Sequence, residues 1–387
     1  MIQNRHFVHR IFSKEVTLLF FYCFFTISCS KPEDGFPDIV HKHITIIYLE
    51  ANNDLRTEAY KAINDLEKGL AGNKFSKESI LVYIKDNNET AYLLKIQPDD
   101  DPHVIKSDTL KSFIASEKTD GKQVHTVLSY IKEQFYSEVY NLIFWSHGTA
   151  WTPADKKSSA PTVMSIGEDR GKQIDILDFR DALPMYFNYI IFDACAMASI
   201  EVLYEFKNNA NYIIASPTDI LAEGFPYSDI VPYLSGASSE NLIGIAQSYF
   251  EYYHAKPGAF QSATISVVEL SKLEKVASYF KIMLSKHNSP LSMEDVQRLD
   301  FTSYFPIQLY DFGDFIGKNF STSENNIIST LLDEAILYKC HTDTFLGNRI
   351  DFFSGLTLSY PQQNSPYYDY YANLSWPKES GWSQYLQ

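Results

Sequence analysis

The chain has 387 residues, of which 45% are hydrophobic and 15% are aromatic. This composition excludes a disordered chain, and the length suffices for one large domain or two small ones. The formal net charge of −15 at pH 7 argues against nucleic acid or an anionic membrane surface as a partner, and it suits cationic substrates.

Residues 1 to 29 have the pattern of an export signal. A basic start is followed by an apolar run over residues 16 to 28, which is shorter than the ~20 residues that a membrane-spanning helix needs. The run ends at Thr26-Ile27-Ser28-Cys29, which resembles a bacterial lipobox, although Thr26 stands where leucine is usual. We expect Cys29 to carry lipid and residues 30 to 40 to form a polar tether. The protein would then be an outer-membrane or cell-surface lipoprotein that meets the membrane through its anchor alone. The alternative is ordinary cleavage nearby, which gives a periplasmic or secreted protein.

The cysteines indicate neither a disulfide framework nor a zinc site. Cys23 lies in the export signal, so an exported chain with lipid on Cys29 retains two distant thiols, Cys195 and Cys340. The chain contains no Cys-x-x-Cys or His-x-x-x-His pattern, so we expect no metal site. Cys340 is followed directly by His341, but adjacent side chains on a strand or helix point apart, which favours a structural thiol.

Strands and helices alternate along the first part of the chain. Apolar runs predict strands at residues 44 to 49, 80 to 84, 91 to 96, 141 to 145, 189 to 193 and 211 to 216. Helical spacing predicts helices at residues 56 to 70, 123 to 136, 175 to 183 and 196 to 207. Residues 86 to 89 predict a hairpin turn, and residues 151 to 172 read as a long loop. The alternation predicts an α/β fold whose mostly parallel sheet is covered by helices on both faces.

The second half is less regular. We expect helices at residues 239 to 254, 270 to 284 and 323 to 338, and strands at 263 to 268 and 355 to 360. No sharp linker follows residue 40, so we expect one domain over residues 41 to 387, consisting of a core with a C-terminal extension.

His147 and Cys195 follow two of the predicted buried strands, and His147 stands 48 residues before Cys195. Ligands and chemistry gather at the carboxyl ends of parallel strands, where a thiol and an imidazole can form a nucleophile and its base. Caspases also place His about 50 residues before Cys. A helix at 196 to 207 would put its N-terminus beside the thiol and stabilise the thiolate. Taken alone, each residue has a structural alternative, a buried cysteine or a turn histidine.

Three sequence blocks carry a family resemblance: Trp145 to Gly148, Phe192 to Glu201, and Tyr212 to Pro217 with Gly224 to Tyr227. In this order and spacing they resemble the clostripain-like cysteine peptidases, relatives of caspases and gingipains, over residues 40 to 387. The resemblance implies a caspase-like fold, Cys195 as nucleophile and His147 as general base and acid. It also implies an oxyanion hole made by the backbone N–H groups of Gly148 and Cys195, and a catalytic dyad without a third member.

The resemblance further implies cleavage after Arg or Lys, which needs an acid in the pocket for the residue before the cleaved bond (P1). Asp193 lies two residues before Cys195, on the same face of an extended segment, but it is equally placed to cap a helix at 196 to 207. Asp219 and Glu223 are further candidates in the loop after strand 211 to 216, with Glu223 ranked slightly above Asp219. A calcium requirement fits the family, although no motif in the chain supports it.

The loop at 151 to 172 carries Lys156, Lys157, Arg170 and Lys172 between the base and the nucleophile. Relatives in this family mature by a cut in the equivalent segment, which makes these four residues candidates for self-processing. The alternative is an ordinary surface loop.

Two other functions compete with peptidase activity. The fold could serve a catalytically silent surface lipoprotein that binds peptides. The aromatic run Tyr367-Tyr368-Asp369-Tyr370-Tyr371 could instead stack on sugars in a glycan-binding lipoprotein, but this would leave His147 and Cys195 unexplained.

Overall fold

The structure, a computed structural model, describes residues 41–72, 78–116, 120–154, 166–170, 172–236, 238–302 and 307–386. The predicted export signal with Cys29, the tether at 30 to 40, and two of the processing candidates, Lys156 and Lys157, lie outside these residues. None of the helices in the described residues is both long and apolar enough to cross a bilayer.

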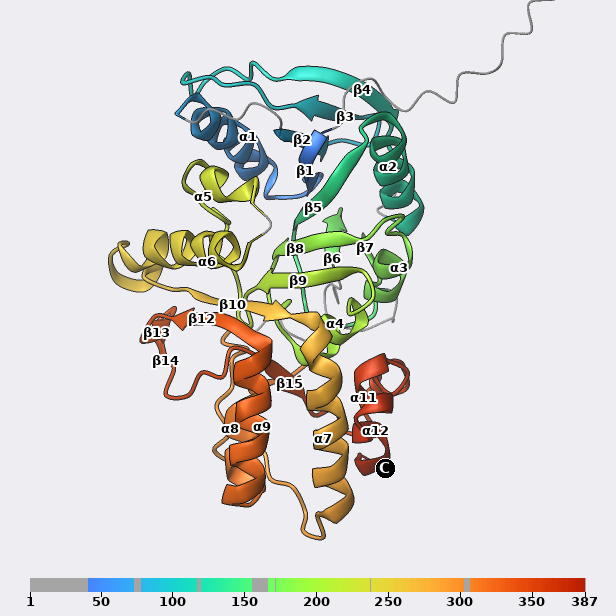
Figure 1. Cartoon of the computed structure of the whole chain (residues 1–387), viewed down its shortest axis with the longest axis vertical. Helices are drawn as coiled ribbons and strands as arrows, with labels where there is room; N and C mark the ends of the chain where they lie inside the picture. The colour runs from blue at the N-terminus through green and yellow to red at the C-terminus, as the bar shows by residue number, and fades with distance from the viewer. Residues whose placement is uncertain are drawn as a thin grey trace, which may run out of the picture. The chain divides into compact units, whose positions relative to one another are not determined.

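A nine-stranded sheet runs through the molecule in the order β12-β10-β9-β8-β5-β1-β2-β3-β4 (Figure 1). Its strands are β1 (His41–Glu50), β2 (Glu78–Lys85), β3 (Thr90–Lys95), β4 (Asp108–Ile114), β5 (Ser137–Trp145), β8 (Phe187–Asp193), β9 (Ala210–Ala215), β10 (Thr264–Glu269) and β12 (Ile336–His341). The central strands β9, β8, β5, β1 and β2 are parallel, and antiparallel strands extend both edges. The predicted hairpin between β2 and β3 is confirmed.

The central strands are apolar on both faces, because helices cover both sides of the sheet. One face packs against α1 (Arg56–Ala71), α5 (Tyr227–Leu234) and α6 (Ser239–His254). The other packs against α2 (Gly121–Gln134), α3 (Ile176–Asp181), α4 (Ile200–Glu205) and α7 (Leu273–Lys286). This two-sided covering confirms the predicted fold class.

Helix α6 shows how local sequence sets an element. Ser238 accepts a hydrogen bond from the N–H of Asn241 and caps the first turn. Leu242, Ile245 and Tyr249 recur at helical spacing and are fully buried against the sheet. Cap and periodicity agree, so the predicted bounds of 239 to 254 match the structure.

The C-terminal part adds to the core on the α7 side (Figure 1). It comprises α8 (Phe312–Asn319), α9 (Thr322–Ala335), α10 (Tyr368–Tyr371), α11 (Ser375–Glu379), α12 (Trp382–Tyr385) and the short pair β11 (Leu309–Asp311) with β15 (Thr357–Ser359). A second short pair, β13 (Thr344–Phe345) with β14 (Asn348–Arg349), packs in a separate small cluster with Leu299, and η1 (Gly258–Phe260) and η2 (Leu270–Lys272) flank β10. Phe280 of α7 stacks on Trp376 at 5.8 Å between ring centroids, and both side chains are fully buried. Full burial of a side chain such as Phe280 contributes about 2 kcal/mol to folding, so the C-terminal segment is held as part of the core.

Several predicted elements are wrong in extent. The helix expected at 196 to 207 is α4, which begins only at Ile200, and residues before it form turns. The helix expected at 323 to 338 ends at Ala335, and β12 follows it, so Cys340 lies on a strand opposite Ile265. β4 and α5 were not predicted. β4 was missed because this edge strand is largely exposed and carries no alternating apolar pattern.

The loop expected at 151 to 172 contains one further strand, and a second begins at its end. β6 (Ile166–Asp169) pairs with β7 (Lys172–Ile174) in an antiparallel hairpin, and every residue of β6 is buried. The last part of this segment is therefore built into the fold.

Candidate active site

The structure brings His147 and Cys195 to the same edge of the sheet. β5 and β8 are neighbours, and their last residues, Trp145 and Asp193, are paired. The N–H of Ser146 donates to the carbonyl oxygen of Asp193 (3.3 Å). This hydrogen bond keeps the segments that follow β5 and β8 side by side just past the strands. The predicted histidine and cysteine each come two residues after this pair.

Gly148 packs directly on the backbone of Cys195. A Cβ atom at Gly148 would lie 2.8 Å from the carbonyl oxygen of Cys195 and 3.2 Å from its nitrogen, so any side chain is excluded there. Within the described part of the chain, neither the N–H of Gly148 nor that of Cys195 donates a hydrogen bond. Two adjacent backbone donors are thus available beside the thiol.

Cys195 lies in a sharp turn rather than at a helix start. Ala196 has a φ of 60°, a left-handed conformation that costs a residue with a side chain about 1–2 kcal/mol. The N–H of Ala196 donates to the carbonyl of Thr218 (2.8 Å), and this contact with the loop after β9 holds the turn. The expected help from a helix N-terminus is therefore wrong, because α4 begins too late to aim its first N–H groups at the thiol.

The thiol contacts the same loop. The N–H of Ile220 donates to Sγ of Cys195 (3.2 Å), and Sγ makes a longer contact to the carbonyl of Ile220 (3.7 Å). Burial raises the pKa of Cys195 well above the usual range of a thiol, and the nearby Asp219 carboxylate raises it further. Within the described residues, no hydrogen bond joins Cys195 to His147. Burial and the nearby carboxylate therefore both favour the protonated form of this thiol.

His147 instead contacts acids. Its Nε2 lies 2.7 Å from Oδ1 of Asp54 and 3.9 Å from Oε2 of Glu168. Among the described residues, these three form a group whose donor atoms lie within 4.8 Å of one another. Calcium takes six to eight oxygen ligands, so a group with two carboxylates and an imidazole nitrogen does not fit the calcium that the family resemblance allows. Neither Asp54 nor Glu168 was singled out from the sequence, although Asp54 follows β1 at the same sheet edge.

Asp193 is buried two residues before Cys195, at the start of the turn that carries it. Its Oδ2 accepts hydrogen bonds from the N–H of Phe225 (3.1 Å) and the hydroxyl of Tyr227 (2.9 Å). Gly224, at a φ of 67°, approaches so closely that a Cβ atom there would lie 2.7 Å from Oδ2. Burial raises the pKa of Asp193 to about 6. The alternative role as a helix cap is wrong, because Ser199 caps α4.

The two further acids lie in different surroundings. Asp219 is beside the Cys195 thiol, and burial raises the pKa of Asp219 to about 6. Glu223 forms an ion pair with Lys256 and accepts a hydrogen bond from the hydroxyl of Tyr252 (2.6 Å). Asp219 therefore contacts the Cys195 thiol, whereas Glu223 is engaged by Lys256 and Tyr252.

Of the processing candidates, the structure describes Arg170 and Lys172. Arg170 is exposed at the turn of the β6–β7 hairpin, and its N–H donates to the carbonyl of Asn52 (3.3 Å). Lys172 is exposed at the start of β7. Both are fixed by the hairpin, so neither lies on a loosely attached loop.

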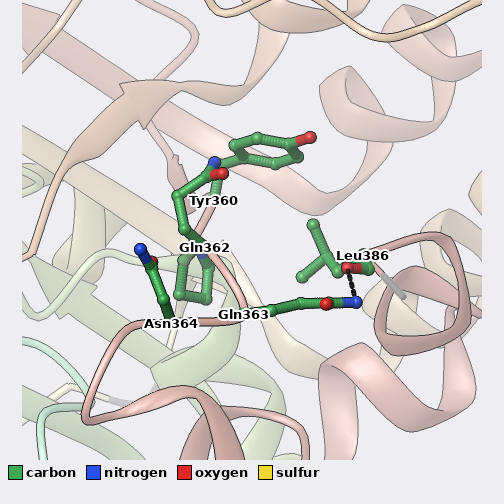
Figure 2. A pocket seen from close by; sticks show the side chains of 6 residues that line it. Tyr360, Gln362, Gln363, Asn364 and Leu386 are labelled. Carbon is green, nitrogen blue, oxygen red and sulfur yellow. Dashed lines mark hydrogen bonds between the residues drawn. The ribbon is translucent and has the colours of Figure 1, made fainter.

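The aromatic run and a nearby cavity lie in the C-terminal part. Tyr367 and Tyr371 are buried, and the hydroxyl of Tyr371 donates to Glu201 (2.9 Å), so the run packs inward rather than offering a row of rings for sugars. A cavity of about 370 Å³ is lined by Tyr360, Pro361, Gln362, Gln363, Asn364 and Leu386 (Figure 2). None of these lining residues belongs to the His147 and Cys195 site.

Comparison with known proteins identifies the family and supports the fold of the chain. A model of the clostripain family matches residues 47–387. A secreted C11 cysteine protease from Bacteroides thetaiotaomicron, iotapain, shares 23% identity with a TM-score of 0.77, covering 89% of this chain and 100% of its own. An inactive zymogen C11 protease from Parabacteroides distasonis shares 24% identity with a TM-score of 0.75, over 89% of this chain and 99% of its own.

A clostripain from Bacteroides thetaiotaomicron, in complex with the peptide inhibitor BTN-VLTK-AOMK, shares 26% identity with a TM-score of 0.50, over 55% of this chain and 97% of its own. No curated protein matches. The family model covers most of the chain, including both predicted catalytic residues. The chain belongs to the clostripain family of cysteine peptidases.

Proposed function

We propose that the protein is an exported cysteine endopeptidase that cleaves after Arg or Lys and uses His147 and Cys195 as its catalytic dyad. The observation that carries this proposal is the packing of Gly148 on the backbone of Cys195. This contact places the end of β5, which leads into His147, against the turn that carries Cys195. The reaction needs no cofactor.

The proposed reaction transfers an acyl group through the thiol. His147 takes the proton from Sγ, and the thiolate attacks the carbonyl carbon of the peptide. The N–H groups of Gly148 and Cys195 donate to the oxygen as it becomes negative. The C–N bond breaks as His147 protonates the leaving amine, and a water deprotonated by His147 then hydrolyses the thioester.

The described state is a resting one under this proposal. Sγ contacts Ile220 and makes no hydrogen bond to His147 within the described chain, so the thiol must leave Ile220 before it can transfer its proton. The similarity to a protease described as an inactive zymogen supports a latent form. Self-cleavage in the segment at 151 to 172 would be the activating event.

Asp193 is proposed to set the preference for basic residues. Both of its hydrogen bonds go to Oδ2, which leaves Oδ1 without a partner among the described residues. A buried carboxylate that pairs with Arg or Lys discriminates against neutral side chains, because these leave the charge unpaired. The inhibitor of the similar clostripain, BTN-VLTK-AOMK, supports a basic preference. Asp219 is the second candidate.

A panel of fluorogenic peptides with Arg, Lys, Asp or Leu at P1 tests the activity. We expect the wild type to cleave the Arg and Lys peptides, and Cys195→Ala and His147→Ala each to lose this activity with an unchanged thermal midpoint. The double variant should be no worse than either single variant, because the two residues act as one unit. Substantial activity in both single variants would contradict the dyad. A folded wild type that hydrolyses none of the peptides would favour the silent binding protein.

Export and lipidation form a separate part of the proposal. The similar protease from Bacteroides thetaiotaomicron is described as secreted, which supports export. Labelled palmitate should enter the wild type and not a Cys29→Ala variant expressed in the same cells. Equal labelling of both would show that Cys29 is not the lipid site.

A further inference from the structure

We propose that Asp54 is a positioning residue for His147, so that the dyad works with a third, carboxylate member. This inference rests on the proposed peptidase function. It adds the residue that orients the general base, which the sequence resemblance leaves unassigned.

The first argument is distance. Oδ1 of Asp54 lies 2.7 Å from Nε2 of His147, within the range of a hydrogen bond between nitrogen and oxygen. Oε2 of Glu168 lies 3.9 Å from the same nitrogen, beyond that range. Two acids therefore face His147, and the geometry selects Asp54.

The second argument concerns which imidazole nitrogen is left for the thiol. A carboxylate only accepts, so a hydrogen bond at Nε2 places the ring proton on Nε2 in the neutral histidine. Nδ1 then carries the lone pair and can take the proton from Sγ of Cys195. Asp54 would thus select the tautomer and steady the imidazolium that forms during the reaction.

The third argument is that the segment carrying Asp54 is held in place, although 82% of the Asp54 side chain is exposed. The side-chain Nδ2 of neighbouring Asn53 donates to the carbonyls of Glu50 (3.1 Å) and Glu168 (2.8 Å). The Oδ1 of Asn53 accepts from the N–H of Leu55 (2.9 Å). Asn53 therefore ties the end of β1 to β6, and Asp54 sits on a fixed backbone.

The exposure of Asp54 limits its expected effect. Water screens the interaction between exposed charged groups, so the pair of Asp54 with His147 contributes less free energy than a buried pair would. We expect a loss of about tenfold in kcat when the side chain is removed, which corresponds to about 1.4 kcal/mol. This loss is far smaller than the loss expected for His147→Ala.

A substitution series at Asp54 separates charge from hydrogen bonding. Asp54→Ala removes both, Asp54→Asn keeps a neutral acceptor, and Asp54→Glu restores a carboxylate. We expect kcat for an Arg peptide to fall about tenfold in the alanine variant, less in the asparagine variant, and to recover in the glutamate variant. KM should stay within about twofold throughout, because Asp54 touches the base and not the substrate.

Two matched controls accompany this series. Glu58→Gln removes one negative charge four residues away, where Glu58 pairs with Lys61 (2.7 Å), and it should leave kcat unchanged. Glu168→Gln removes the more distant acid and should cost less than Asp54→Ala. An alanine variant with unchanged kcat, or a loss that appears mainly in KM, would overturn the positioning role.

A second measurement does not depend on activity. Nitrogen-15 NMR of the full-length Cys195→Ala protein reports which ring nitrogen of His147 carries the proton, with His147→Ala identifying the signal among the 10 histidines. We expect the Nε2-protonated form with Asp54 present and a mixture of tautomers with Asp54→Ala. The same mixture in both proteins would overturn the inference. If neither the wild type nor any variant cleaves the peptides, but His147 is still protonated on Nε2, the proposed function is rejected. The pairing of Asp54 with His147 would then still stand.

Discussion

The ammonium of Lys85 lies 2.7 Å from a carboxylate oxygen of Asp169, and both side chains are buried. Nζ of Lys85 also lies 3.5 Å from Glu50, while Asn52 donates to Asp169 from the end of β1. Asp169 is the last residue of β6, the strand in the last part of the proposed processing segment at 151 to 172. The ion pair therefore fastens the last part of that segment to the end of β2.

Removing the cation from this pair should destabilise the protein strongly. We expect Lys85→Met to lower the free energy of unfolding by about 3–5 kcal/mol, because two carboxylates then share a buried site without it. Urea denaturation of the full-length Cys195→Ala protein, followed by tryptophan fluorescence, measures this. The matched control is Lys61→Met, which breaks an exposed pair with Glu58 and should cost no more than about 1 kcal/mol. Similar losses in the two variants would show that the buried pair has no special role.

The preference for basic peptides should depend on pH through Asp193. Because burial raises the pKa of Asp193 to about 6, its carboxylate is charged above this pH and neutral below it. We expect the ratio of kcat/KM for an Arg peptide over a Leu peptide to fall as the pH drops through about 6, by up to about tenfold per pH unit. Taking the ratio cancels the ionisation of His147 and Cys195, which both peptides require.

The variants Asp193→Asn and Asp219→Asn decide which acid is responsible. Asp193→Asn should give a low ratio that no longer changes with pH, while Asp219→Asn should keep the dependence of the wild type. If Asp219→Asn removes the dependence and Asp193→Asn retains it, the P1 acid is Asp219.

Parts of this architecture follow from local sequence, and parts depend on contacts that no local pattern reveals. The apolar runs before His147 and Cys195 predict two strand ends, and parallel pairing then brings the two residues together. Ser238 and the spacing of Leu242 and Ile245 likewise specify α6. In these places composition, periodicity and tertiary packing agree.

The turn at Cys195 and the strand β6 could not be predicted in this way. Ala196 favours helix, yet its contact with Thr218, distant in sequence, holds it at a positive φ. β6 contains Glu168 and Asp169, and charged residues in sequence indicate a loop. Asp169 is buried in a strand because Lys85, distant in sequence, forms an ion pair with it. Asp54 was missed for a related reason. Its proposed role depends on its contact with His147, which lies 93 residues away in the sequence.

Asp219 should control how readily Cys195 ionises. Burial is the main reason for the raised pKa of the Cys195 thiol, and the negative charge of Asp219 adds to it. Asp219→Asn removes that charge and should therefore lower the thiol pKa, which speeds alkylation by iodoacetamide at pH ~8 several-fold. Below about pH 6 Asp219 is protonated in the wild type, so the two proteins should converge there. The control Asp219→Glu keeps the charge and should react like the wild type, and equal rates in all three would exclude this coupling.

Self-processing should occur after Lys156 or Lys157 rather than after Arg170 or Lys172. A peptidase must bind the chain around the cleaved bond in an extended form, whereas Arg170 and Lys172 lie in the β6–β7 hairpin beside buried Asp169. Cleavage there would require this hairpin and its ion pair to open. Lys156 and Lys157 precede it and match the proposed preference for basic residues.

N-terminal sequencing of incubated protein tests the position of the cut. We expect a new N-terminus after one of the two lysines in the wild type and none in Cys195→Ala. Replacing both Lys156 and Lys157 by Gln should leave the chain whole, while Arg170→Gln should be cut like the wild type. The two fragments should co-elute on size exclusion, because the sheet contains strands from both fragments and the pair of Lys85 with Asp169 joins them. A fully active wild type that stays uncut would show that this segment is not an activation switch, and a cut after Arg170 would show that the hairpin opens before processing.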